Sequence, residues 1–184
     1  MNLRIVDNPF NVGYVCLFVA LFLLTACSDR SPLKIGFLGG ISGRVADLGI
    51  GGRNGATLAL ELRNAAGGID GQQLQLLSED DRQDVTQANA ALERLIAQKV
   101  EAVIGPMTSA MAIAVTPQAN AAKMLLLSPT ATTTALSGID DYFLRVISPT
   151  TSYAQKSASY HYHKQQVRHP AVIYDLSNRA YTES

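Results

Sequence analysis

The sequence predicts an α/β fold in three layers, a parallel sheet with helices on both of its faces. From residue 33 onwards, short apolar segments alternate with longer segments of helical periodicity. The apolar segments are followed by glycine, proline or acidic residues, as is typical of strands buried in a parallel sheet. A regular alternation of strand and helix implies right-handed crossovers between parallel strands.

Six segments have the length and apolar character of buried strands. They cover residues 34–38, 73–77, 102–104, 124–127, 142–146 and 171–174.

The helical segments lie between these strands. The first is expected over residues 54–66, where Leu58 and Leu62 recur at helical spacing and Gly67-Gly68 ends the helix. The third is expected over residues 109–122, bent or interrupted at Pro117, and the fourth over residues 151–164.

The second helix begins at a capping box, Asp84-x-x-Gln87, in which each side chain can bond the backbone of the other residue. Its apolar residues recur on one helical face, which we expect to pack on the sheet. They are Val85, Ala88, Leu92, Leu95 and Ile96.

Composition excludes several classes of protein. The 184 residues include 15 basic and 15 acidic side chains, so the chain lacks the positive charge of a nucleic-acid-binding protein. With 47% hydrophobic and 16% charged residues, it is too apolar for a disordered tail. Two cysteines cannot form a disulfide scaffold. No nucleic-acid partner and no cofactor are expected.

The N-terminal segment is typical of an export signal. Its apolar run, residues 15–24, is too short to span a bilayer but has the length of a signal-peptide core. The run leads into Leu24-Thr25-Ala26-Cys27, which resembles the lipobox of bacterial lipoproteins. This resemblance implies cleavage of residues 1–26, lipidation of Cys27, a tether over residues 27–32 and anchoring to a membrane of the cell envelope.

Small polar residues follow three of the predicted strands, in loops 39–43, 105–109 and 128–132. Because parallel strands end at one edge of the sheet, these loops should meet there. The second loop opens a helix, whose free N–H groups suit a carboxylate. The simpler alternative is that each hydroxyl only caps a helix or stabilises its own turn. The candidate ligand-binding hydroxyls are those of Thr108, Ser109, Thr130 and Thr132.

From Leu33 to Ser184 the chain resembles the type 1 periplasmic binding proteins of the branched-chain amino-acid class. The most specific motif is Asn64-Ala65-Ala66-Gly67-Gly68-Ile69-Asp70-Gly71. The others, in the order typical of the family, are Leu33–Phe37, Ile41–Gly43, Glu79–Asp81, Val103–Pro106 and Ser128–Thr132.

This resemblance implies a flavodoxin-like lobe and the function of a solute receptor for an ABC importer, with a membrane permease as partner. The ligand would be an amino acid or a related small carboxylate, and no catalytic or metal-binding residue is implied. Ser109, Thr130 and Thr132 match the residues that hold the ligand's carboxylate, and Tyr181 matches an aromatic residue that packs on the ligand. Leu48 stands where many members have an aromatic residue.

Family members fold as two lobes that close on the ligand. On this pattern, residues 33–148 form the N-terminal ligand-binding lobe, and residues 149–184 form the first helix and strand of a truncated second lobe. We therefore expect impaired binding, because closure supplies the second set of ligand contacts. A frameshift, an early stop and a deliberately short fragment are all compatible with the sequence.

Two alternatives to a solute receptor follow from other features of the chain. Residues 49–54 approximate a dinucleotide-binding fingerprint, with Asp80 or Asp81 as the ribose ligand, but Asn54 departs from it and the glycines lie well past the first strand. An envelope regulatory or interaction lipoprotein with the same fold is the other alternative. The histidines in His161-Tyr162-His163 have the wrong spacing to share a helical face, so a solvated surface is expected there rather than a metal site.

Overall fold

The computed structural model describes residues 31–173, 176 and 179–183. The predicted signal peptide and the lipidation site at Cys27 lie outside these residues. Within the described residues, no helix combines the length and the apolar character that crossing a membrane requires.

Five parallel strands form one sheet in the order β2-β1-β3-β4-β5. Because β1 lies between β2 and β3, the chain turns to opposite sides of β1, which creates a switch point at the carboxyl ends of β1 and β3. The predicted α/β fold with a parallel sheet is confirmed. The strands are β1 (Leu33–Gly39), β2 (Leu74–Asp80), β3 (Ala102–Ile104), β4 (Leu126–Ser128) and β5 (Phe143–Arg145).

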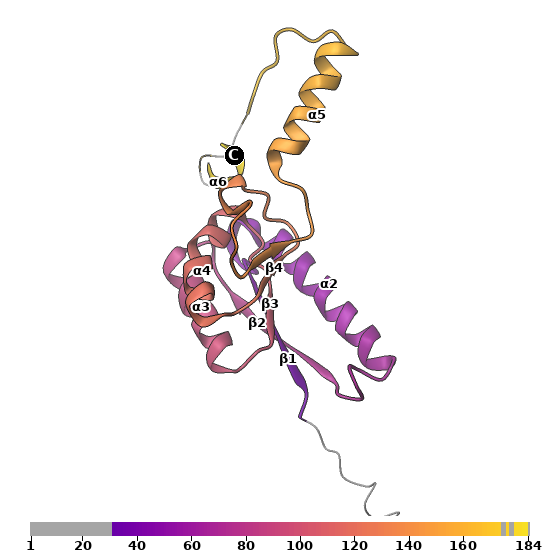
Figure 1. The fold of residues 1–184 in the computed structure, drawn as a ribbon, viewed down its shortest axis with the longest axis vertical. Helices are drawn as coiled ribbons and strands as arrows, with labels where there is room; N and C mark the ends of the chain where they lie inside the picture. The colour runs from indigo at the N-terminus through magenta and orange to yellow at the C-terminus, as the bar shows by residue number, and fades with distance from the viewer. Residues whose placement is uncertain (1–30, 174–175, 177–178, 184) are drawn as a thin grey trace, which may run out of the picture. The chain divides into compact units, whose positions relative to one another are not determined.

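Helices cover both faces of the sheet. Helix α2 (Ala46–Ala65) packs on β1 and β2 at one face, whereas α3 (Val85–Ala97) and α4 (Ser109–Ala122) pack together on the other (Figure 1). The remaining elements are the short 3-10 turns η1 (Gly43–Val45) and η2 (Thr134–Leu136) and the helices α5 (Thr150–His163) and α6 (Arg179–Thr182).

Two apolar cores result from this layering. The larger lies between the sheet and α3 and α4, and includes the fully buried Leu38, Leu92 and Val115. The smaller lies under α2 and joins Phe37 to Ala56 and Met107.

The start of α3 follows the prediction in part. Asp84 is the N-cap, and its carboxylate accepts a hydrogen bond from the backbone N–H of Gln87 at 2.9 Å. The backbone N–H of Asp84 bonds to the carbonyl of Asp81 at 3.0 Å, in place of the reciprocal capping-box bond to the Gln87 side chain. The predicted apolar face is buried or, at Ile96, half-buried, except for Val85, which lies in the exposed first turn.

Helix α2 differs from the prediction in its start and its buried face. It begins at Ala46 rather than at residue 54, and Leu58 and Leu62 are 56% and 63% exposed. The buried residues are Gly49, Ala56 and Leu60. Glycine has a poor intrinsic helix propensity, so the sequence favoured a later start. Close packing at two of its glycines outweighs that propensity, because a Cβ at Gly49 would lie 2.0 Å from the carbonyl oxygen of Gly40 and one at Gly52 would lie 2.4 Å from Cε of Met107.

The predicted strand at 171–174 is wrong over its described residues, because residues 171–173 form no regular structure and Ile173 is 99% exposed. An apolar segment becomes a strand only where a sheet edge pairs with its backbone. Among the described residues, no strand pairs with residues 171–173. In contrast, the third helix runs without interruption through Pro117, and α5 matches the fourth within one residue.

Candidate functional site

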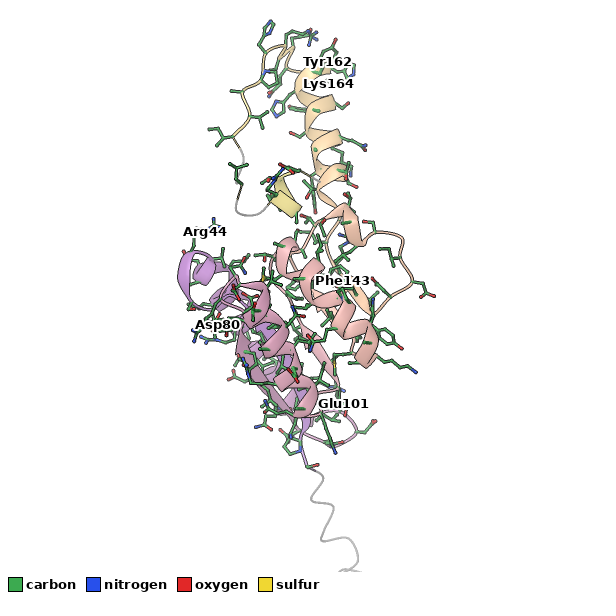
Figure 2. The ribbon with its side chains drawn as sticks, turned by 90° about the vertical axis from the view of Figure 1, so that its left-hand side faces the viewer. Arg44, Asp80, Glu101, Phe143, Tyr162 and Lys164 are labelled. Carbon is green, nitrogen blue, oxygen red and sulfur yellow. The ribbon has the colours of Figure 1, made fainter. Side chains whose placement is uncertain are left out.

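A pocket of about 440 Å³ opens at the carboxyl edge of the sheet. Figure 2 labels Asp80, which ends β2, at this edge, and Glu101, which precedes β3, at the opposite edge. All five residues that the sequence predicts as ligand contacts line this one pocket. Its lining is Leu48, Met107, Thr108, Ser109, Thr130, Thr132, Ile147, Thr150, Tyr153 and Tyr181.

The loops after β3 and β4 form the floor of the pocket and are hydrogen-bonded to each other. The hydroxyl of Ser128 donates to the carbonyl of Pro106 at 2.6 Å, and that of Thr130 donates to the carbonyl of Met107 at 2.5 Å. Gly105 allows this arrangement, because its φ is +119° and an added Cβ would lie 2.0 Å from the carbonyl oxygen of Leu38. Thr130 therefore acts mainly to hold the two loops together.

Ser109 and Thr132 are both buried and contact each other. The backbone N–H of Thr132 donates to Oγ of Ser109 at 3.3 Å, and the hydroxyl of Thr150 donates to Oγ1 of Thr132 at 2.6 Å. Each hydroxyl thus accepts a hydrogen bond and keeps its own proton for a further acceptor. Within the described residues neither proton has an acceptor, so both can be donated to a ligand.

The N-terminus of α4 faces the same pocket. The backbone N–H groups of residues 109–111 have no partner within the helix, as in every α-helix. Thr108 occupies the N-cap position but makes no capping hydrogen bond, and its hydroxyl instead donates to Oε1 of Gln83 at 3.0 Å. The open N–H groups and the helix dipole make this end of α4 suitable for an anion.

Two acidic residues end β2 and behave differently. Burial acts to raise the pKa of Asp80, but hydrogen bonds from Ser42 at 2.5 Å and from the backbone N–H groups of Arg82 and Ile41 outweigh it and hold the pKa below its usual value. Asp81 is fully buried, and burial raises its pKa despite hydrogen bonds from Gln83. Both carboxylates are engaged in the β2–α3 connection, and neither lines the pocket.

One loop that the sequence predicts to be part of the site lies outside it. None of residues 39–43 lines the pocket, because Ile41 and Ser42 are bound to Asp80. Conversely, Thr150 lines the pocket although sequence reasoning missed it. It lies in a cluster of hydroxyl residues that follows the fifth predicted strand, the same signal as in residues 128–132, and that signal could have placed the cluster at the carboxyl edge of the sheet.

The upper wall of the pocket is apolar or aromatic. Leu48 comes from the first turn of α2, Tyr153 from α5 and Tyr181 from α6. Tyr181 is 47% exposed, so this wall remains accessible to solvent.

The residues that suggested a dinucleotide-binding site or a metal site lie outside the pocket. Residues 49–54 lie inside α2 rather than in the turn that leaves β1, so they do not form a dinucleotide-binding loop. His161 and His163 lie near the exposed end of α5, where Figure 2 labels Tyr162 and Lys164. Across the described ranges, no three His, Cys, Asp or Glu side chains are grouped to hold a metal ion.

The parallel sheet with helices on both faces matches a lobe of a periplasmic binding protein, and comparison with known proteins agrees. The family model for periplasmic binding proteins matches residues 32–181, and the chain belongs to that family. This is a family of binding proteins rather than of enzymes, and its members are exported.

The relatives confirm the resemblance to the branched-chain amino-acid class. The Leu/Ile/Val-binding protein homolog 3 of Brucella melitensis is 29% identical over 82% of this chain, and the Leu/Ile/Val-binding protein of Escherichia coli is 27% identical over 87%. The chain spans about two-fifths of the length of these relatives, 41% and 43%.

A solved structure shows the same fold. The branched-chain amino acid transporter substrate binding protein LivJ of Streptococcus pneumoniae, in complex with isoleucine, superposes with a TM-score of 0.70 at 34% identity. The superposition covers 74% of this chain and 39% of that protein.

Proposed function

We propose that this protein is the solute-binding receptor of an ABC importer, and that its pocket holds the carboxylate of an amino acid or a related small acid. One observation carries the proposal: the free hydroxyl protons of Ser109 and Thr132 and the uncapped N-terminus of α4 converge in one pocket. All of these groups donate hydrogen bonds, and a helix N-terminus favours negative charge.

The rest of the pocket supports a small apolar side chain on the ligand. Leu48, Met107 and Ile147 provide aliphatic contacts, and Tyr181 can pack on the ligand. The relatives that match most of this chain are named for leucine, isoleucine and valine, which have side chains of this kind.

The pocket residues that the structure describes should, by themselves, bind the ligand with low affinity. Leu48, Tyr153 and Tyr181 are all substantially exposed, so water competes for the donors of the site. In the family, a second lobe closes over the ligand, so the groups described here would supply one side of the binding site.

Leucine, isoleucine and valine, titrated into the protein and followed by calorimetry or ligand-observed NMR, test the proposal. Ser109→Ala should weaken binding about fivefold or more, because it removes a buried hydroxyl donor to the carboxylate. Ser78→Ala, at an exposed position on β2, is the matched control and should bind as the wild type does. Absence of binding across a broad panel of amino acids and carboxylates would overturn the proposed function.

The membrane partners are also part of the proposal. Lipidation of Cys27 would tether the receptor to a membrane, where a permease could take up the solute. Cys27→Ser should abolish both acylation and processing of the precursor, seen as a mobility shift and loss of labelling by a radioactive fatty acid. Cleavage at the same bond in the variant would contradict the lipobox interpretation.

A further inference from the structure

Thr108 has the residue type and the backbone geometry of a helix cap, yet it does not cap. Its φ and ψ are −121° and 150°, the extended conformation usual at an N-cap, and threonine is among the preferred residues there. The side chain instead adopts a rotamer that brings its hydroxyl to Oε1 of Gln83, 25 positions earlier in the chain. In this position the hydroxyl oxygen accepts no hydrogen bond from the first N–H groups of α4.

The side chain of Gln83 is held in place by a buried carboxylate. Its backbone N–H and its side-chain Nε2 both donate to Oδ1 of Asp81, at 2.8 Å and 3.0 Å. Because Nε2 is bound to Asp81, Oε1 is the end of the amide that faces Thr108. Asp81 is fully buried, so solvent does not compete for these bonds.

The backbone of the connection between β2 and α3, which carries Gln83, has an unusual conformation. Arg82 and Gln83 both have positive φ, 50° and 55°, although neither is glycine. Two consecutive residues in the left-handed region carry a free-energy cost, which the hydrogen bonds from their N–H groups to Asp80 and Asp81 offset. As a result, Gln83, which does not line the pocket, is hydrogen-bonded to Thr108, which does.

We propose that Gln83 is a positioning residue for the pocket: by engaging the hydroxyl of Thr108, it prevents self-capping of α4 and leaves the N–H groups there open to the ligand's anionic group. This inference rests on the proposed function for the identity of the ligand. The chain of contacts itself, from Asp81 through Gln83 to Thr108, does not depend on it.

The test uses Gln83→Met, which keeps the length of the side chain but removes both its donor and its acceptor. Thr108 is then free to turn and cap α4. Two effects should follow: slower amide hydrogen exchange at Ala110 and Met111, and weaker binding of leucine by about fivefold, the effect of one competing N-cap hydrogen bond. Gln87→Met, at an exposed position on α3, is the matched control and should change neither.

The double variant Gln83→Met/Thr108→Val separates positioning from a general loss of structure. Without the Thr108 hydroxyl no self-cap can form, so hydrogen exchange should return toward the wild-type rate and leucine should bind more tightly than to Gln83→Met alone. A merely structural role for Gln83 would instead make the double variant bind no better than the single one.

The outcomes distinguish this inference from the proposed function. Unchanged exchange at residues 110 and 111 in Gln83→Met would overturn the inference even where leucine binds to the wild type. Slowed exchange with unchanged affinity would also overturn it, since the N–H groups would not be the anion site. If the wild type binds neither leucine nor the panel of carboxylates, the proposed function fails and the ligand part of the inference fails with it, whatever the exchange rates show.

Discussion

Gly49 offers a direct test of how closely α2 packs on the loop that follows β1. A Cβ added at position 49 would lie 2.0 Å from the carbonyl oxygen of Gly40, far below any real contact between these atoms. The neighbouring atom belongs to the backbone, so it cannot move aside as the end of a flexible side chain can. Gly49→Ala must therefore push the helix away from the sheet.

A glycine-to-alanine substitution at another position in α2, Gly55, shows the expected change in stability where there is no clash. Gly55 has no atom within 4 Å of an added Cβ, so Gly55→Ala should stabilise the protein by about 1 kcal/mol, the difference in helix propensity between the two residues. Gly49→Ala gains the same ~1 kcal/mol but also incurs the cost of overpacking, about 1–3 kcal/mol or more. With a backbone clash this close, we expect the upper end of that range and a net loss of roughly 2 kcal/mol.

Urea unfolding followed by circular dichroism at 222 nm measures both effects, because the protein has no tryptophan to report by fluorescence. The two variants should shift the unfolding midpoint in opposite directions. If Gly49→Ala stabilises the protein as much as Gly55→Ala does, α2 does not approach Gly40 as described, and the explanation of its early start is wrong.

Three further predictions concern the β2–α3 connection and the end of α2. Asp84→Ala removes the N-cap of α3 and should cost about 1 kcal/mol of unfolding free energy in urea, whereas an unchanged midpoint would exclude the cap. Because burial raises the pKa of Asp81, this group favours folding below its ordinary pKa of 3.8 and loses that effect as pH rises through the raised value. Asp81→Asn should therefore raise the melting temperature most near pH 7, with a gain that shrinks in acid; a gain independent of pH would contradict this reasoning. Asn64→Ala breaks two hydrogen bonds to the backbone of Leu74, at 2.8 Å and 2.7 Å, and should lower the free energy of unfolding in urea by about 1–3 kcal/mol. A negligible change would show that these bonds are not formed.

Much of the sheet could be predicted because its signals are local. Apolar segments that end at glycine, proline or acidic residues identified the five strands of the sheet, and a hydroxyl-rich loop after a parallel strand must lie at the carboxyl edge. For this reason the amino-acid sequence alone was enough to place Ser109, Thr130 and Thr132 at that edge. Their role as ligand contacts stays a prediction.

The errors have a common physical cause. The start of α2 was missed because helix propensity disfavours glycine, and only the proximity of Gly40 explains why glycine is required at position 49. The predicted strand at 171–174 is wrong over residues 171–173 because an apolar run does not show whether a sheet edge is available to pair with it. The bond of Thr150 to Thr132 could not be predicted because it spans 18 residues and depends on how the chain returns after β5.

The sequence by itself determined the fold class, the family and the donors that could meet a carboxylate, since these follow from periodicity, motifs and residue type. Only the tertiary structure decided which donors are free. Thr130 uses its proton on Met107, Thr108 uses its own on Gln83, and Ser109 and Thr132 keep theirs. A hydroxyl group has a single proton, and the acceptor that receives it is set by neighbours in space rather than in sequence.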